Sequence, residues 1–263
     1  MSLLARQRQA LILEQVRERG AVRVSDLAER FGVSDMTVRR DLDVLARRRL
    51  VDKVHGGATA VGPVAASTDE PGFAVKSGRQ QAEKEAIAEA AARLVEPGTA
   101  VGLSAGTTTW ALARRIADVA DLTVVTNSMA VAEVLHAARR PDRTVVLTGG
   151  IRTPSEALVG PVAVAALRSL NLDVVFLGVH GMSAASGFTT PNLMESETDR
   201  ALVEAGQRLV VVADSTKWGT AGISTIAELS EADVLVSDDG LDADARAVLE
   251  GEVDQLVLAP ARE

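Results

Sequence analysis

Arg39 and Arg40, with Met36 and Thr37 just before them, form a group of side chains suited to reading DNA bases. Arg can form a bidentate hydrogen bond with guanine, and Thr or Met can contact the methyl group of thymine. Ser34 precedes this group and can offer its hydroxyl and the free amides of a helix start to a phosphate. These residue types in this order predict contact with double-stranded DNA.

The segment that carries these side chains has the pattern of a helix. Val38, Leu42 and Leu45 recur at helical spacing and predict its buried face, which leaves the two arginines on the outer side. A shorter helical pattern ends before Gly32, and a first helix is expected to end at Gly20. Two short helices joined by a glycine-containing turn predict a helix-turn-helix, whose second helix enters the major groove.

A hairpin is expected after this helix. Residues 50–54 alternate in polarity and lead into two glycines at 56–57, a pattern typical of a hairpin, here a wing that brings Lys53 and His55 to the DNA backbone or the minor groove. The three arginines at 47–49 have a common alternative as a solvated charged face. Their position beside a helix-turn-helix favours DNA binding.

The charge of the chain is unevenly distributed. The net charge is −8, yet residues 1–58 carry 12 Lys and Arg against 8 Asp and Glu, whereas the remainder carries 16 against 28. The local field near DNA matters more than the sum over the molecule, so a basic head on an acidic body is compatible with DNA binding.

Composition narrows the classes of function. The absence of cysteine excludes disulfides and thiolate chemistry, and the three histidines lack metal-ligand spacing, so neither a metal nor a cofactor is expected. Aromatic residues make up 2% of the chain, which disfavours stacking on single-stranded nucleic acid. No apolar run approaches the length of a membrane span and no secretory signal is recognisable, so we expect a cytoplasmic protein without a membrane partner.

The rest of the chain predicts an α/β domain. We expect a DNA-binding domain over residues 1–58, a linker over 59–82 that contains two prolines, and a second domain over 83–263. In the second domain short apolar strands alternate with helical patterns, which predicts a mainly parallel sheet with helices on both faces.

Ligands of such sheets bind outside the carboxyl ends of the strands, where this chain carries small and polar residues. One exit, the sequence SAGTTT at 104–109, opens a helix and can present amides and hydroxyls to an anion, although a threonine-rich cap is commonly structural. His180 has the alternative of a loop histidine with an internal partner, and Glu195 that of a helix cap. The residues expected to bind a small-molecule effector are Ser104, Gly106, Thr107, Thr108, Thr109, Asn127, Gly149, His180, Glu195 and Lys217.

Two groups of motifs resemble the DeoR family of bacterial transcription regulators. Residues 33–42 and 55–58, VSDMTVRRDL and HGGA, are similar to its N-terminal domain. The segments GTTT at 106–109, TNS at 126–128, LVGP at 158–161 and DSTK at 214–217 are similar to its sensor domain. The resemblance implies a winged helix-turn-helix, a second domain with a fold like that of ribose-phosphate isomerases, a phosphorylated sugar or related metabolite as effector, and a homodimer or higher oligomer.

Two other functions compete with this hypothesis. An isomerase would need carboxylates and a Lys that the resemblance places at 177–181 and in the following glycine loop, and here Leu177, His180 and a lone Glu195 stand instead. A ligand-independent DNA-binding protein would use its second domain only to oligomerise. We therefore expect no enzyme but a repressor of a carbohydrate catabolic operon, released from its operator by a phosphorylated sugar.

Overall fold

The computed structural model describes residues 5–19, 21–47, 50–54, 57–59 and 73–261. The chain divides into two compact units, residues 1–65 and residues 66–263.

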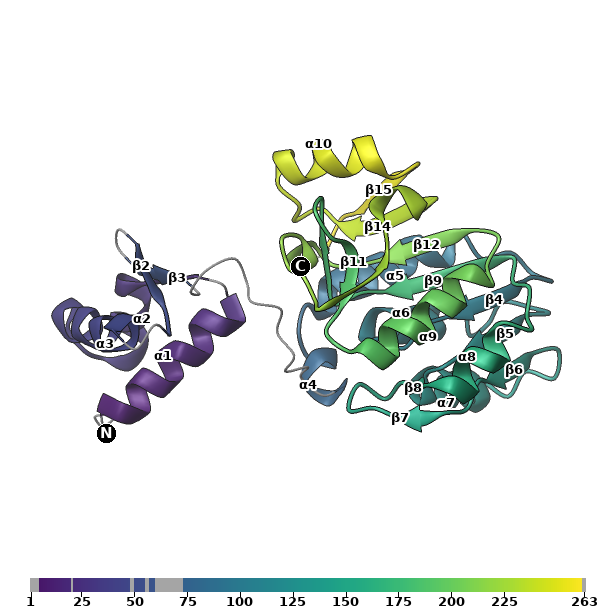
Figure 1. Ribbon diagram of the computed structural model, residues 1–263, viewed down its shortest axis with the longest axis horizontal. Coiled ribbons are helices and arrows are strands. Elements are labelled where there is room, and N and C mark those ends of the chain that lie inside the picture. The colour runs from purple at the N-terminus through teal and green to yellow at the C-terminus, as the bar shows by residue number, and fades with distance from the viewer. Residues whose placement is uncertain (1–4, 20, 48–49, 55–56, 60–72, 262–263) are drawn as a thin grey trace. The chain divides into compact units, whose positions relative to one another are not determined.

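The N-terminal unit is a winged helix-turn-helix, as the sequence predicts (Figure 1). Its core is formed by apolar side chains from all three helices, among them Ile12, Leu27 and Leu42, each no more than 1% exposed. Val38 and Leu45 are buried as well, which confirms the predicted inner face of the second helix of the motif. The elements are α1 (Ala5–Arg19), β1 (Ala21–Arg23), α2 (Val24–Phe31), α3 (Asp35–Arg47), β2 (Asp52–Val54) and β3 (Gly57–Thr59).

The wing contains one strand more than the sequence indicates. β2 and β3 pair antiparallel, with Val54 opposite Gly57, as expected for the hairpin. β1 adds a third strand on the other side of β3, with Val22 opposite Ala58. Three residues are too few to show an alternation in polarity, so the sequence pattern did not reveal β1.

The C-terminal unit contains a seven-stranded parallel sheet. The strands follow the order β15-β14-β12-β9-β4-β5-β6, and every neighbouring pair is parallel. This confirms the predicted α/β class. The strands are β4 (Ala100–Leu103), β5 (Thr123–Thr126), β6 (Thr144–Leu147), β9 (Val174–Gly178), β12 (Leu209–Val212), β14 (Val234–Asp238) and β15 (Leu256–Ala259).

Helices cover both faces of this sheet (Figure 1). Alternate residues of one strand enter different cores: Phe176 packs on the side of α5, α6 and α7, and Leu177 on the side of α8, α9 and α10. Both side chains are fully buried, and burial of such a side chain stabilises the fold by about 1.5–3 kcal/mol. The helices are α5 (Gln81–Ala92), α6 (Thr107–Arg115), α7 (Met129–Ala137), α8 (Pro161–Leu167), α9 (Leu193–Glu204) and α10 (Ala243–Glu252).

Smaller elements surround the carboxyl edge of the sheet. An antiparallel sheet in the order β10-β11-β13 and the hairpin β7-β8 were not expected, because their strands have only two to four residues each. They comprise β7 (Ile151–Arg152), β8 (Leu158–Val159), β10 (Gly181–Ser183), β11 (Gly187–Thr190) and β13 (Ser224–Ala227), with the 3-10 turns η1 (Ser215–Lys217) and η2 (Leu229–Glu231).

Part of the segment expected to be a linker is helical. Residues 60–72 lie outside the described residues, but Phe73–Ser77 form the short helix α4, and α5 begins at Gln81. Phe73 stands edge-on to the ring of Trp110, with the ring centroids 6.0 Å apart. The small polar residues around this segment concealed an aromatic contact that only the tertiary structure forms.

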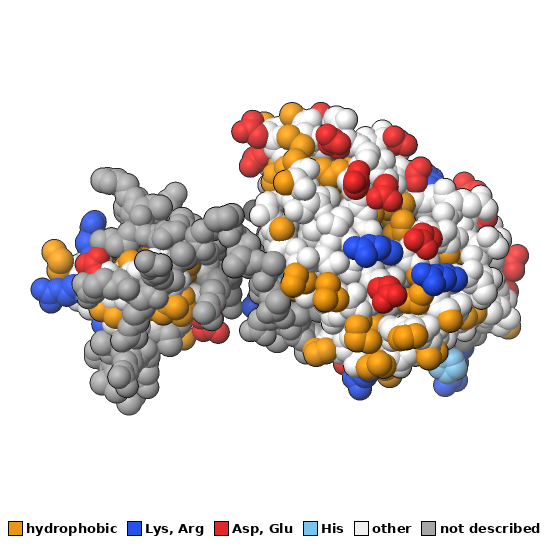
Figure 2. Space-filling model, in the orientation of Figure 1, with side chains coloured by type: hydrophobic (Ala, Val, Ile, Leu, Met, Phe, Trp, Pro, Cys, Tyr) orange, Lys and Arg blue, Asp and Glu red, His pale blue; other side chains and the backbone are white. Residues whose placement is uncertain are grey.

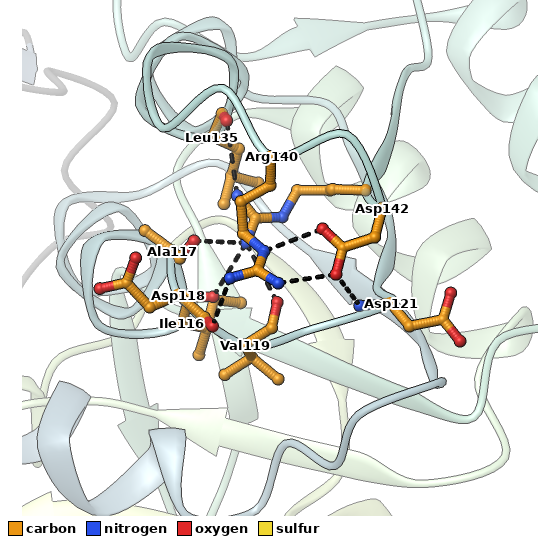
Figure 3. Close-up of polar contacts among 9 residues, drawn as sticks. Ile116, Ala117, Asp118, Val119, Asp121, Leu135, Arg140 and Asp142 are labelled. Carbon is orange, nitrogen blue, oxygen red and sulfur yellow. Dashed lines mark hydrogen bonds and ion pairs between the residues drawn. The ribbon is translucent and has the colours of Figure 1, made fainter.

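At the amino edge of the sheet, the guanidinium group of Arg143 contacts backbone carbonyl groups at the C-terminal ends of α6 and α7. The side chain of Arg143 donates to the carbonyl oxygens of Val119, at 3.2 Å, and of Ile116 and Ala117, which follow α6. It also lies 3.5 Å from the carbonyl oxygen of Leu135 near the end of α7. Figure 3 shows these carbonyl groups converging. A cation at two helix C-termini offsets their negative dipole ends.

Candidate functional site

The outer face of α3 carries the side chains that the sequence predicts to meet DNA. Ser34, Met36, Arg39 and Arg40 are exposed, and Met36 retains 59% of its accessible surface. The backbone amide of Thr37 donates to the Ser34 hydroxyl oxygen at 3.3 Å, so Ser34 caps the helix as expected. Figure 2 shows Lys and Arg side chains projecting from the described part of this unit.

A buried ion pair holds α3 against α1. Arg8 Nε lies 2.6 Å from Asp41 Oδ2, and the two side chains are 8% and 5% exposed. Gln9 donates to the other carboxylate oxygen of Asp41 at 2.8 Å. Asp41 follows the arginine pair directly in sequence, so this anchor determines which way the helix presents Arg39 and Arg40. Charge counting does not reveal it, because Asp41 looks like any surface carboxylate in the sequence.

Of the two predicted wing contacts, Lys53 and His55, the structure describes only the backbone of Lys53. Lys53 lies in the middle of β2, paired with Ala58 of β3. His55 lies outside the described residues. Their contact with DNA remains a prediction.

In the C-terminal unit the order of the strands identifies where a ligand would bind. From β4 the chain moves outward through β5 to β6, and from β9 it moves the opposite way through β12 and β14 to β15. The order therefore reverses between the neighbours β4 and β9. In open α/β sheets the crevice beyond the strand ends at such a reversal is the usual ligand site.

The residues at this reversal are joined by hydrogen bonds. The hydroxyl of Ser104, after β4, accepts from the amide of Gly178, at the end of β9, at 2.9 Å. Asn127, after β5, uses Oδ1 to accept from the amide of Ala105 at 2.8 Å. Three strand ends are thereby brought together, and Ser104 and Asn127, two of the residues predicted to bind an effector, lie at this place.

Asn127 has one half of its amide group unused. The side chain is 1% exposed, and Nδ2 is one of three buried side-chain polar atoms without a partner among the described residues. A buried donor without an acceptor costs about 1–3 kcal/mol, and such groups are rare in folded proteins.

The loop that Asn127 holds leads into α6. Gly106 precedes the helix and contributes no side-chain cap, while Thr109 donates back to the Gly106 carbonyl oxygen at 3.0 Å. Thr107 and Thr108 are buried in the first turn. The start of a helix carries partial positive charge and amides without helical partners, so this corner suits an anion.

Two predicted residues lie on opposite sides of the reversal along the same edge. Gly149 follows β6 with φ of 75°. Lys217 ends η1 after β12, with its Nζ 4.0 Å from Asp214 Oδ2. β6 and β12 are four strand spacings apart, about 19 Å, so one phosphate group cannot contact both.

His180 and Glu195 have partners within the protein. The amide of His180 donates to the Thr189 carbonyl oxygen at 3.0 Å, and its side chain is half-buried. Glu195 is buried and accepts from the hydroxyls of Thr153, at 2.8 Å, and Ser155. Asn192, rather than Glu195, caps α9, since its side chain accepts from the first-turn amides.

Comparison with protein families assigns both units. The sequence model of the DeoR-like helix-turn-helix domain matches residues 8–63, and that of the DeoR C terminal sensor domain matches residues 79–239. The chain belongs to the DeoR family of transcriptional regulators. The resemblance seen in the sequence motifs is thereby confirmed.

Relatives within the DeoR family match this chain over nearly its full length. The HTH-type transcriptional regulator YgbI of Escherichia coli is 37% identical over 95% of this chain and 97% of its own. The glycerol-3-phosphate regulon repressor of Escherichia coli is 30% identical, over 88% and 90%. Since such relatives are regulators of transcription, the isomerase alternative is set aside and the chain is a regulator, not an enzyme.

Among solved structures, ribose 5-phosphate isomerase A of Methanocaldococcus jannaschii is similar to 51% of this chain and 53% of its own, with a TM-score of 0.38 and 15% sequence identity.

Lys84 and Asp214 are charged residues of the sensor domain that are buried and do not belong to the predicted site. Lys84, on α5, is 6% exposed, and the charge of Asp214, which is 1% exposed, acts on it. Burial lowers the pKa of Lys84 from 10.5 to about 8. A lysine near the start of a polar helix has no sequence pattern that distinguishes a buried one.

A hollow elsewhere on the sensor domain does not coincide with this edge. It lies between the C-terminal turns of α8 and α9, around Leu167 and Ala205. In the part of the chain that the structure describes, no helix is long and apolar enough to cross a membrane.

Proposed function

We propose that this DeoR family member is a repressor of a carbohydrate catabolic operon, and that a phosphorylated sugar or related metabolite releases it from double-stranded operator DNA. The family assignment supports regulation of transcription. The name of one relative, the glycerol-3-phosphate regulon repressor, supports a response connected with a phosphorylated polyol.

The unpartnered Nδ2 of Asn127 is the observation on which the effector site rests. It belongs to the side chain that fixes the loop before α6, where Ala105 donates to its Oδ1. An amide NH2 can only donate, so the complementary ligand atom is an acceptor such as a phosphate oxygen. The uncapped start of α6 favours the same negative charge.

The remaining predicted residues indicate how a bound sugar would lie along the edge of the sheet. A phosphate held at residues 106–109 leaves the sugar free to extend along the carboxyl edge, toward Lys217 on one side or Gly149 on the other. His180 lies on the loop after β9, one of the two strands at the reversal, and we assign it to a hydroxyl of the sugar. We assign Glu195 a supporting role, because its carboxylate already binds the hydroxyls of Thr153 and Ser155.

For DNA we propose that α3 enters the major groove. Arg39, Arg40, Thr37 and Met36 would face base edges, and Ser34 a phosphate. The protein would act as a homodimer or higher oligomer, with two copies on the two half-sites of an operator. Operator DNA and phosphorylated metabolites meet in the cytoplasm, so the proposal places the protein there.

The test of the effector site uses the two tryptophans. Trp110 follows the threonine loop and Trp218 follows Lys217, and the chain has no tyrosine, so emission comes from these two residues. A panel of sugar phosphates that includes glycerol 3-phosphate is titrated into the full chain, and operator binding is measured with and without each compound. We expect at least one compound to change the emission and to lower operator affinity.

Asn127→Asp is the variant that isolates the donor. It keeps the oxygen that accepts from Ala105 but replaces the NH2 group with a negatively charged oxygen, so binding of the phosphorylated compound should be lost. Asn171→Asp, at an exposed position, makes the same change away from the site and should bind as wild type does. If no sugar phosphate alters emission or operator release, the protein is a ligand-independent DNA binder and the proposal is wrong.

A further inference from the structure

Lys84 fastens the short helix α4 to the start of α5. Its Nζ donates to the carbonyl oxygen of Lys76, in the last turn of α4, at 2.7 Å, and to that of Arg79, in the following loop, at 2.6 Å. These charge-assisted hydrogen bonds are stronger than those between neutral groups. An ammonium has three donors, so one donor remains beyond these two carbonyls.

The same short helix is docked beside the anion corner. Phe73, at the start of α4, meets Trp110 edge-on, and its amide donates to the Pro154 carbonyl oxygen at 3.4 Å. Trp110 is in the first turn of α6, where its amide donates to the carbonyl oxygen of Gly106 at 3.0 Å. α4 therefore touches the element that carries the threonine loop.

Lys84 also experiences the charges of residues that follow β12. Burial lowers its pKa most, the negative charge of Asp214 raises it, and the positive charge of Lys217 lowers it, as does that of Lys76 on α4. Lys217 lies 4.0 Å from Asp214. A change in charge at Lys217 therefore changes the pKa of Lys84.

We propose that Lys84 is a positioning residue that couples occupancy of the Lys217 corner of the effector site to the docking of α4. α4 is the first described element after β3 of the N-terminal unit, so the coupling acts on the segment through which the two units are joined in the chain. The inference rests on the proposed effector site, whose ligand is an anion.

The direction of the effect follows from the charges. An anion beside Lys217 offsets the repulsion that this residue exerts on Lys84. The ammonium form of Lys84 then becomes more favourable, and it holds the carbonyls of Lys76 and Arg79 more firmly. Anion binding should consequently tighten α4, and the anion should bind more strongly when Lys84 is protonated.

Sulfate is the suitable probe, because it stays a dianion between pH 7 and pH 9. Hydrogen exchange of residues 73–79 is measured in the full chain with and without sulfate, and sulfate affinity is measured by tryptophan emission at both pH values. The variants are Lys84→Met, Lys84→Arg and, as the matched control, Lys76→Met, which removes a lysine of α4 but keeps the backbone carbonyl that Lys84 binds.

We expect sulfate to slow exchange of residues 73–79 in the wild type and in Lys76→Met. In Lys84→Met these amides should exchange faster, and sulfate should not change their exchange rate. Lys84→Arg should restore part of the protection. Sulfate affinity of the wild type should fall at least about fivefold from pH 7 to pH 9, the lower end of usual coupling between sites, and that of Lys84→Met should not change.

Two other results would overturn the inference, and they differ in what they leave standing. If sulfate binds but exchange of residues 73–79 responds equally in the wild type and Lys84→Met, Lys84 does not couple the two and the effector site stands. If neither sulfate nor any sugar phosphate binds the wild type, the effector site and the coupling fail together.

Discussion

The hydroxyl oxygen of Ser104 and the amide nitrogen of Gly178 lie 2.9 Å apart, and their hydrogen bond joins β4 to β9 at the point where the strand order reverses. Ser104 is fully buried. A Cβ atom at position 178 would lie 3.5 Å from Thr109 and 3.8 Å from the Ser104 hydroxyl, which are ordinary van der Waals contacts. The floor of the candidate site is thus built from a backbone amide and a hydroxyl.

Removal of this hydroxyl should weaken the sensor domain. Ser104→Ala leaves the Gly178 amide without its acceptor, at an expected cost of about 1–3 kcal/mol in the free energy of unfolding. Both tryptophans lie in this unit, so urea unfolding followed by their emission measures the effect. Ser230→Ala, at an exposed position, should change the free energy of unfolding by less than about 0.5 kcal/mol. Equal stability of the two variants would contradict the assignment.

The arginine pair should carry operator recognition. Arg39→Ala and Arg40→Ala should each weaken operator binding by about 1–3 kcal/mol if the side chains read bases. Both residues are exposed, so the thermal stability of the N-terminal unit should stay close to that of the wild type. Arg93→Ala, which removes an exposed arginine of the C-terminal unit, is the control and should bind the operator normally. Full affinity in both test variants would rule out the placement of α3 in the groove.

The wing lysine should act through phosphate rather than through bases. Lys53→Ala should weaken binding to all DNA sequences alike, and the slope of log affinity against log salt concentration should fall by about one. Titrations of specific and random duplexes at several salt concentrations separate the two kinds of contact. A loss confined to the operator sequence would instead assign Lys53 to base recognition.

Arg143 should be important for the stability of the sensor domain. Arg143→Met removes the donors that serve the carbonyl groups shown in Figure 3, and we expect a loss of about 2 kcal/mol or more in the free energy of unfolding. Arg168→Met, at an exposed position, is the matched control. Hydrogen exchange should locate the change at the ends of α6 and α7. A uniform loss of protection across the unit would argue against a local cap.

Because of Lys84, the free energy of unfolding should increase as the pH rises through the alkaline range. Its pKa is about 8 in the fold against 10.5 for an ordinary lysine, so between these values the unfolded chain holds a proton that the folded chain has released. Raising the pH through this window therefore favours the fold, by at most about 3.5 kcal/mol, since one pKa unit corresponds to about 1.4 kcal/mol. Below about pH 8 both the folded and the unfolded chain hold the proton, so Lys84 adds no pH dependence to the free energy of unfolding there. Unfolding of wild type and Lys84→Met at pH 7.5 and pH 10 measures it, and parallel curves would contradict the buried position.

Local patterns predicted the elements that decide the protein's class. The spacing of Val38, Leu42 and Leu45 identified the buried face of α3, and the Ser34 cap was recognised from its residue type and position. Strand and helix patterns in the second unit gave the parallel sheet and two helical layers. They succeed because amphipathic periodicity depends on neighbours in the chain.

Contacts between distant segments could not be predicted in this way. The partnership of Asp41 with Arg8, of Lys84 with the carbonyls of α4, and of Glu195 with the hydroxyls of a hairpin each join residues of ordinary polar type. Short strands such as β1 and β10 owe their existence to a partner strand rather than to their own sequence.

The sequence by itself predicted a helix-turn-helix and an α/β domain, because residue type and spacing are enough to specify helices and strands, and its motifs resembled those of the DeoR family. Only the tertiary structure decided which strand ends meet. The reversal between β4 and β9 places Ser104 against Gly178. Burial in the assembled unit leaves Asn127 with an unused donor and lets the charge of Asp214 act on Lys84. Strand order and burial are properties of the assembled sheet, and they set both the location and the electrostatics of the site.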